Sequence, residues 1–321
     1  VAADALDAPL PEEHEELVAA ASRRLDVVLE ITEQAIAARP AEMLHAVGRL
    51  RERGAALALD DVGAVTRSLA LMPLLAPEVI KLDLRLVQDR PTVDMASVAN
   101  AVSAQAERSG AVVVAEGLET AAQVETAQAL GAQYGQGWLL GRPGPLPGRF
   151  ESPRSPLRVR RQAPDRDPRT PFEIVSAGLP LRRGDKGLLL KISRQLEQQA
   201  TAQGDATILL SAFQEARHYT PFTGRHYSAL AEQLAFVGAL ASDLPAEPSP
   251  GVRGAALDRD GPLAQEWNVT VVAPHFAAAF VARDLGDEGP DAARRFDFAL
   301  TYDRGLAVAS AGALMRHMPL G

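Results

Sequence analysis

The chain has 321 residues, 47% of them hydrophobic, and is long enough to bury two hydrophobic cores. Its formal charge of -8 argues against a direct nucleic-acid binder, because neutralising phosphates requires a concentrated basic surface. Cysteine is absent, which excludes disulfides, zinc–thiolate sites and thiol catalysis. No apolar run approaches the roughly 18 residues of a membrane helix, and residues 1–11 lack a secretion-signal pattern, so we expect a cytoplasmic protein with no membrane partner.

The N-terminal part alternates short β-branched runs with amphipathic helical stretches from residue 27 to about residue 137. The predicted strands are 27–32, 56–62, 79–84 and 111–117, and the predicted helices are 42–53, 92–108 and 120–130. Each helix ends near a glycine that can serve as its C-cap. The alternation predicts repeated βα units around a parallel sheet.

Acidic residues follow nearly every predicted strand of this part: Glu30 and Glu33, Asp60 and Asp61, Asp83, and Glu116 and Glu119. In a parallel βα barrel the carboxyl ends of all strands open onto one face, so these side chains are expected to converge around one substrate. The alternative is that each acid only caps the helix that follows it. That explanation suits any single acid better than it suits all of them together.

Residues 148–171 are predicted to be a linker, because prolines and arginines alternate there. Seven arginines stand between Arg149 and Arg169 against three acidic residues, in an otherwise acidic chain. A basic linker could touch an acidic partner or RNA, but we favour a solvated, semi-extended spacer.

In residues 172–321 the helical and strand-like segments follow a different order from that in the first part, which predicts a second α/β domain. Helices are expected at 187–203 and 227–241, and strands at 267–273 and 296–302. Glycine-containing stretches at 251–261 and 286–290 are predicted turns.

Five motifs occur in a fixed order in the first part: Leu29-Glu30-Ile31-Thr32-Glu33, Asp60-Asp61-Val62-Gly63, Lys81-Leu82-Asp83, Ala115-Glu116-Gly117-Leu118-Glu119-Thr120 and Gln136-Gly137-Trp138-Leu139-Leu140-Gly141-Arg142-Pro143. This series resembles the motifs of EAL phosphodiesterase domains, over roughly residues 1–147. The resemblance implies a partial TIM-type (β/α) barrel in this part. It also implies a cyclic-di-GMP phosphodiesterase that releases linear pGpG.

Hydrolysing a phosphodiester requires an activated water and neutralisation of phosphate charge, tasks suited to hard divalent cations such as Mg²⁺ or Mn²⁺ held by carboxylates. The resemblance implies that four carboxylates hold metal: Glu30, Asp60, Asp61 and Asp83. It implies that Lys81 positions the attacking water and that Glu116 assists at the metal. It also implies that Glu119 and Gln136 support the substrate and that Glu33 stabilises the loop after Asp61. Lys81 is one of only three lysines among 33 basic residues, which favours a specific role over that of an ordinary surface lysine.

Two other enzyme classes find no support in the same stretch. Gly135-Gln136-Gly137 lacks the spacing of a dinucleotide-binding loop, and no acidic residue follows a strand at the expected distance. A Ser-His-Asp hydrolase is equally unsupported, because the G-x-S-x-G elbow is absent.

The sequence departs from the EAL pattern in three places. It contains no Glu-Ala-Leu tripeptide, the strand bearing a metal-binding asparagine is missing before residues 1–5, and the loop 62–68 differs from the usual Phe-Gly-Thr-Gly-Tyr-Ser form. We therefore expect weak or no hydrolysis from the chain as written, which is either a fragment, a protein whose start was assigned too late, or a degenerate barrel. The alternatives are a catalytically inactive cyclic-di-GMP receptor and a pure interaction scaffold. Domains of this kind often form homodimers.

The second part carries Leu210-Ser211-Ala212-Phe213-Gln214-Glu215-Ala216-Arg217, Arg225-His226-Tyr227, Glu266-Trp267 and a stretch from Arg294 to Arg304, which resemble the DICT sensory domain. The resemblance covers roughly residues 172–317 and implies an unidentified ligand or signalling partner. A sensory pocket for an anionic or aromatic ligand is predicted from Arg217, Arg225, Tyr227, Trp267, Tyr302 and Arg304. The alternative is structural: Glu266, Asp297 and Asp303 pair with the arginines, and the aromatic rings fill the core.

Overall fold

A computed structural model describes residues 16–17, 20, 24–25, 27–89, 92–145, 148, 157, 159–287 and 290–319. Its contacts divide the chain into two compact units. The N-terminal unit comprises Val1–Ala38, Ala46–Thr66 and Ala76–Pro164, and the C-terminal unit comprises Arg39–His45, Arg67–Leu75 and Asp165–Gly321. Residues 1–11 and part of the expected linker, residues 149–156 and 158, lie outside the described part of the chain.

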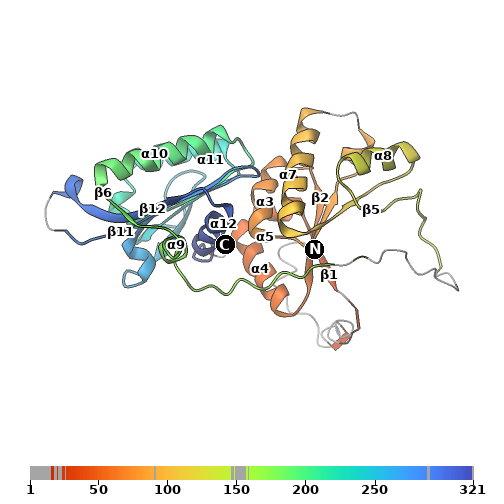
Figure 1. The fold of residues 1–321 in the computed structure, drawn as a ribbon, viewed down its shortest axis with the longest axis horizontal. Coiled ribbons are helices and arrows are strands. Elements are labelled where there is room, and N and C mark those ends of the chain that lie inside the picture. The colour runs from red at the N-terminus through yellow and green to blue at the C-terminus, as the bar shows by residue number, and fades with distance from the viewer. Residues whose placement is uncertain are drawn as a thin grey trace. The chain divides into compact units, whose positions relative to one another are not determined.

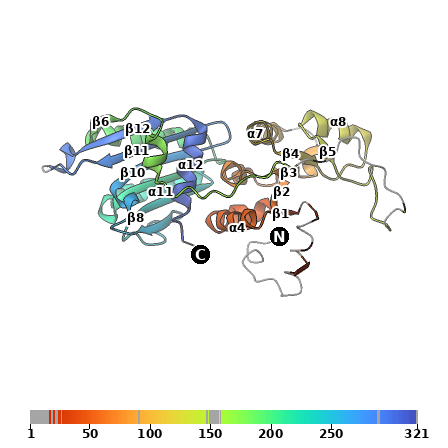
Figure 2. The same ribbon diagram turned by 60° about the horizontal axis from the view of Figure 1, so that its bottom comes forward.

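The described part of the N-terminal unit is built on one parallel sheet in the order β1-β2-β3-β4-β5. Its strands are β1 (Val28–Thr32), β2 (Ala56–Val62), β3 (Val79–Leu82), β4 (Val112–Ala115) and β5 (Tyr134–Gly135). Figure 2 shows β1 to β4 lying one beside the next in that order. Parallel strands that follow chain order are the arrangement in one arc of a (β/α) barrel. The predicted α/β architecture of this part is confirmed.

Helices connect these strands, as parallel pairing requires. They are α3 (Glu33–Ala38), α4 (Pro40–Glu52), α5 (Met72–Leu75), α6 (Arg85–Gln88), α7 (Val93–Ser109) and α8 (Ala121–Ala129). The Thr92 side chain accepts a hydrogen bond from the Met95 backbone N–H at the start of α7, and Gly110, at φ 73°, ends that helix in the left-handed conformation. Thr120 and Gln123 form a capping box at the start of α8. The predicted strands 79–84 and 111–117 are shorter in the structure, because their last residues belong to the edge that carries the acidic side chains.

The central strands are buried along nearly their whole length, as parallel strands covered on both faces are. Ile80 and Leu82 on β3 are fully buried, and Lys81 between them is only 8% exposed. A lysine in such a position needs partners for its ammonium group, because an isolated buried charge is strongly unfavourable.

The C-terminal unit contains a mixed sheet in the order β6-β12-β11-β10-β7-β8-β9. Its strands are β6 (Arg182–Asp185), β7 (Ile208–Glu215), β8 (Phe236–Ser242), β9 (Arg253–Leu257), β10 (Glu266–Val272), β11 (Ala277–Asp284) and β12 (Arg295–Thr301). Strands β7, β8 and β9 are parallel, and β10 pairs antiparallel with both β7 and β11. Its helices are α9 (Pro171–Ser176), α10 (Lys186–Ala202), α11 (Pro221–Gln233) and α12 (Arg304–Met315).

Helices cover both faces of this sheet, and alternate residues of its strands pack against them. On β11, Ala278, Phe280 and Ala282 pack with side chains of α10 and α11. The intervening residues of the same strand pack with α9 and α12. This two-residue alternation is the normal geometry of a strand, and Figure 1 shows α10 on one side of the sheet and α9 with α12 on the other.

Two expectations for this unit are wrong. The predicted helix 227–241 is half strand, because residues Phe236–Ser242 form β8, which is buried throughout. A continuous apolar run fits a buried strand or a buried helix equally well, so periodicity could not separate them. The predicted turn at 251–261 contains β9, Arg253–Leu257, whose Ala255 and Leu257 are buried.

The charged pairs in this unit also differ from the ones expected. Glu266 is fully buried and pairs with Arg283 (3.2 Å), while its carboxylate also accepts hydrogen bonds from Thr170 Oγ1 and the Phe172 N–H. Asp297 pairs with Arg183, and Asp303 caps α12 by accepting from the Leu306 N–H. These acids therefore stabilise the unit's own framework. Among the described residues, no helix is both long and apolar enough to cross a membrane.

Candidate functional site

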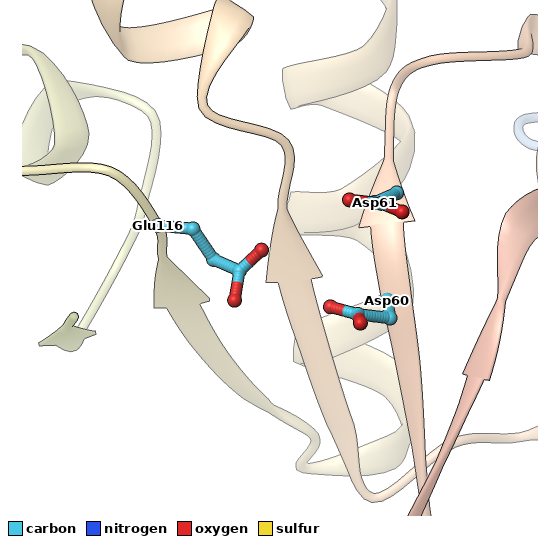
Figure 3. Close-up of side chains that lie close together, drawn as sticks. All are labelled: Asp60, Asp61 and Glu116. Atoms are coloured by element: carbon cyan, nitrogen blue, oxygen red, sulfur yellow. The ribbon is translucent and has the colours of Figure 1, made fainter. Parts of the chain in front are cut away.

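Three carboxylates meet at the carboxyl edge of the N-terminal sheet. Asp60 and Asp61 end β2, and Glu116 directly follows β4, two strands away in the sheet order. One oxygen from each lies within 4.8 Å of the others. Figure 3 shows the side chains of Asp60 and Glu116 turned toward each other across the end of the intervening strand. We call Asp60, Asp61 and Glu116 the carboxylate cluster.

Lys81 reaches the carboxylate cluster from β3, the strand in between. Its Nζ lies 2.8 Å from Asp60 Oδ1 and 2.7 Å from Glu116 Oε1. A third contact, of 3.1 Å, joins it to Glu30 Oε1 on β1. Burial alone would lower the pKa of Lys81, but the hydrogen bonds to these three carboxylates raise it well above its usual value. Lys81 is therefore a permanent cation and hydrogen-bond donor at neutral pH.

The carboxylates resist ionisation to different degrees. Burial raises the pKa of Glu116, and the charges of Asp60 and Asp61 add to that effect, although Lys81 opposes it. Burial also raises the pKa of Asp61, and the neighbouring Asp60 and Asp83 raise it further. Mutual repulsion of this kind marks a site with more negative charge than its own lysine neutralises.

The chain direction at Asp61 is set by an unusual backbone conformation. Asp61 has a φ of 58°, in the left-handed region that non-glycine residues seldom adopt. The pairing of β2 with β3 shifts register between Leu59 and Val62, so the strand bulges here. A bulge re-aims side chains, and it lets Asp60 and Asp61, adjacent in sequence, both supply oxygens to one cluster.

The loop after Asp61 is fastened by Glu33, whose side chain is 1% exposed. Its carboxylate accepts hydrogen bonds from the Gly63 N–H at 3.2 Å and the Val65 N–H at 2.7 Å. Gly63 has a φ of 107°, and a Cβ there would lie 2.7 Å from Leu86 Cδ1. The loop thus combines a buried carboxylate anchor with a position that only glycine fits.

The other residues of the predicted site lie apart from the carboxylate cluster. Asp83 is buried and bonded to Arg85 through its side chain at 2.9 and 3.1 Å and its N–H at 2.8 Å. Burial would raise the pKa of Asp83, but Arg85 holds it below its usual value. Glu119 and Gln136 are exposed on the following segments. Arg85 was not singled out from the sequence, although its position two residues after a strand-end aspartate could have indicated the pair.

The donor set fits a hard divalent cation. The three oxygens of the carboxylate cluster come from β2 and from the end of β4 and are close enough to share one ion, and carboxylate oxygens are the ligands that such ions prefer. Glu30 is linked to the cluster through Lys81. The side chains therefore provide oxygen ligands on one side and a fixed ammonium group beside them.

The C-terminal unit holds a separate cavity of about 390 Å³. Of the residues predicted for a sensory pocket, Arg217, Tyr227 and Trp267 line it. Arg225 is exposed on α11 outside the lining, Tyr302 is 60% exposed beside Phe276, and Arg304 donates a hydrogen bond to the Ala273 carbonyl at 2.8 Å. The lining also includes Glu197 and His226, which the sequence did not single out.

The sequence around Glu197 contains a signal that could have identified it. It follows Leu196 and stands four residues after Ser193 and three before Ala200, all buried on the inner side of α10. A charged residue on the buried side of an amphipathic helix requires a partner, and this could have marked the position.

Fold and side chains together define a two-domain α/β protein whose first domain gathers carboxylates and a lysine at the ends of parallel strands. Residues 2–143 match the family model described as "EAL domain". Residues 176–285 match the model "Sensory domain in DIguanylate Cyclases and Two-component system", abbreviated DICT. The chain thus carries an EAL domain followed by a DICT domain, and both predicted resemblances are confirmed.

Curated relatives match the EAL part of the chain. "Cyclic di-GMP phosphodiesterase RocR" of Pseudomonas aeruginosa is 38% identical over 120 residues, which are 37% of this chain and 31% of that protein. "Cyclic di-GMP phosphodiesterase NbdA" of the same organism is 36% identical over 120 residues, 37% of this chain and 15% of that protein. The chain therefore spans less than a third of the length of either relative.

Among solved structures, "Klebsiella pneumoniae BlrP1 pH 8.0 calcium/cy-diGMP complex" is 32% identical and covers 40% of this chain and 33% of that chain. Its TM-score is 0.36, which is too low to support an argument from the superposition.

Proposed function

We propose that this protein acts in cyclic-di-GMP signalling and that its EAL domain binds and hydrolyses cyclic-di-GMP with Mg²⁺ or Mn²⁺. The observation that carries the proposal is the grouping of Asp60, Asp61 and Glu116 within 4.8 Å around the ion-paired Lys81. The names of the curated relatives, which are cyclic-di-GMP phosphodiesterases, support the choice of substrate. The likeness covers a minority of each relative, so the substrate is part of the proposal.

Glu30, Asp60 and Asp61 would hold the metal, with Glu116 assisting at the same ion and Asp83 supporting a second ion. When bound, a divalent cation supplies Lewis acidity toward the phosphate and the attacking water. The chain's own residues would stabilise the phosphate charge and take up the proton. Lys81 stays protonated, so it acts as a hydrogen-bond donor and a positive charge beside the phosphate, and it is not the base. Glu116 has a raised pKa, which suits it to take up the proton of the attacking water.

Glu119 and Gln136 complete the proposed substrate site from the exposed segments after β4 and β5. Glu33 would act indirectly, as a positioning residue, because its carboxylate fixes the loop that follows Asp61. The proposed site would thus draw residues from all five strands of the sheet, as is usual for catalytic groups of parallel barrels.

A second candidate is a receptor that binds cyclic-di-GMP without cleaving it. The sequence favours this candidate in one respect, because loop 62–68 after Asp61 departs from the Phe-Gly-Thr-Gly-Tyr-Ser form of the family pattern. An altered loop beside a metal ligand would slow hydrolysis more than it would weaken recognition, since catalysis depends on ligand geometry more steeply than binding does.

The test is to incubate the chain with cyclic-di-GMP and Mn²⁺, measure linear pGpG by chromatography and measure binding by calorimetry. Slow, metal-dependent release of pGpG that Lys81→Met abolishes supports the enzyme. Binding without pGpG supports the receptor. Absence of both in the folded chain contradicts both candidates.

A further inference from the structure

The cavity of the DICT domain has an aromatic floor. Trp267 on β10, Phe296 on β12 and Phe213 on β7 all line it. The Trp267 and Phe296 rings meet edge to face with centroids 5.7 Å apart, so their positions are fixed by one another. Rings held in this way give the cavity a rigid aromatic wall, and a volume of about 390 Å³ is within the usual range of small-molecule sites.

The polar side chains in the wall of the cavity form hydrogen bonds with one another. Glu197 is 6% exposed, and its carboxylate accepts a hydrogen bond from the Tyr227 hydroxyl and bonds His226 Nε2, both at 2.9 Å. Tyr227 itself is 1% exposed and lies 2.8 Å from Ser211 Oγ. Because both oxygens of Glu197 have partners, the wall does not require a cationic ligand.

The cations around the cavity differ in what they pair with. Lys186 pairs with Asp291, and Arg217 pairs with Glu215. Arg194 on α10 lies over the Phe222 ring, 5.8 Å from its centroid. In the described part of the chain, no carboxylate lies within ion-pair distance of Arg194. Because Arg194 also lines the cavity, its guanidinium is placed to bind an anion there.

We propose that this cavity binds a small planar aromatic carboxylate, with the ring system against Trp267, Phe296 and Phe213 and the carboxylate on Arg194. The aromatic wall favours a ligand with an aromatic ring system, and Arg194 favours a ligand with a negative charge. Tight binding therefore requires both features in one ligand. The site lies wholly within the DICT domain, and the proposal stands independently of the chemistry of the EAL domain.

The test uses 2-naphthoate as the probe and 2-naphthamide as its uncharged analogue, titrated into the full chain by calorimetry. We expect one site for 2-naphthoate, and we expect Arg194→Met to weaken it about tenfold to a hundredfold, the loss of one charged hydrogen-bonding partner. The matched control is Arg225→Met, an exposed arginine on α11 outside the lining, which should leave the affinity unchanged. The amide should bind weakly and equally to both variants.

Two further measurements keep the result interpretable. The chain has two tryptophans, so in a Trp138→Phe background the fluorescence of Trp267 alone should report naphthoate binding. Leu190→Trp in the parent chain, which fills the cavity, should abolish naphthoate binding in the calorimetric titration while circular dichroism shows an intact fold. Absence of naphthoate binding overturns the proposal. Equal binding of acid and amide, or equal effects of the Arg194 and Arg225 variants, overturns it as well.

Discussion

The carboxylate cluster of the EAL domain and the cavity of the DICT domain arrange charge in opposite ways. In the first, one cation, Lys81, is surrounded by three carboxylates, and further acids stand nearby. In the second, one buried carboxylate, Glu197, bonds a hydroxyl and an imidazole group, and Arg194 at the lining has no ion-pair partner among the residues that the structure describes. The first is poised to attract cations and the second to attract anions, although the whole chain is acidic.

The two regions also differ in what their charges do for stability. Removing a carboxylate from an overcrowded cluster relieves repulsion, whereas removing the only carboxylate of a buried network leaves its donors without an acceptor. Substitutions at equivalent chemical groups should therefore have effects of opposite sign in the two domains.

The largest effect is expected for Glu197→Ala. The substitution removes one of the two hydrogen-bond partners of the fully buried Tyr227 hydroxyl, leaving Ser211 Oγ, and opens space in the core, which should lower the free energy of unfolding by about 3 kcal/mol. Urea denaturation monitored by circular dichroism measures it. Gln198→Ala, exposed on the same helix, should change stability by less than about 0.5 kcal/mol. Equal effects of the two variants would show that the Glu197 network contributes nothing.

Lys81→Met should have the next largest effect. It leaves Glu30, Asp60 and Glu116 without their shared cation, and we expect a loss of about 2 kcal/mol in metal-free buffer, less than for a fully buried pair because these carboxylates are partly solvated. Addition of Mn²⁺ should restore part of the melting temperature. A variant as stable as the parent in metal-free buffer would contradict the proposed role of Lys81 in balancing the cluster.

A smaller effect concerns the pH dependence of the His226–Glu197 contact. The hydrogen bond to Glu197 raises the pKa of His226, against an opposing effect of burial and of the charge of Arg194. Stability from this contact is fully present below the unfolded pKa of about 6.5 and is lost as the pH rises through the raised folded pKa.

The difference in unfolding free energy between the parent and His226→Gln, measured from pH 5 to pH 9, should therefore shrink with rising pH. The difference isolates this contact from His218 and His317, whose pKa values burial lowers. A difference that stays constant over this range would contradict the assignment.

The smallest effect, and the one of opposite sign, is expected for Asp61→Asn. The pKa of Asp61 is raised by partial burial and by its neighbours Asp60 and Asp83, and because solvent screens this exposed carboxylate, a neutral side chain should stabilise the metal-free protein by only about a few tenths of a kcal/mol. Asparagine also tolerates the left-handed backbone of this position. Thermal melts in EDTA measure the change, and a clear loss of stability would argue against repulsion in the cluster.

The sequence predicted the carboxylate cluster better than it predicted the cavity, for a physical reason. Asp60 and Glu116 each follow an apolar run that forms a strand, and parallel strands bring such positions to one edge whatever the details of packing. The cavity instead combines α10, α11, β7, β10 and β12, and no local pattern states which faces of these elements meet.

Two wrong predictions of secondary structure in the second domain also prevented the cavity from being predicted. Strand β8 was predicted as the end of a helix and β9 as a turn, so the order of the mixed sheet could not be foreseen. The aromatic residues Tyr227 and Trp267 were identified by their chemistry, but Arg194 could be assigned to the cavity only once the position of α10 over the sheet was known.

The central claim is that side chains from separate strands hold a divalent cation beside Lys81. Titration of Mn²⁺ into the metal-free chain, followed by electron paramagnetic resonance, tests it without any nucleotide. We predict binding that weakens at least about tenfold in Asp60→Asn and in Glu116→Gln, and that is unchanged in Glu125→Gln, an exposed glutamate on α8. Equal Mn²⁺ affinity in all three variants and the parent would contradict the account.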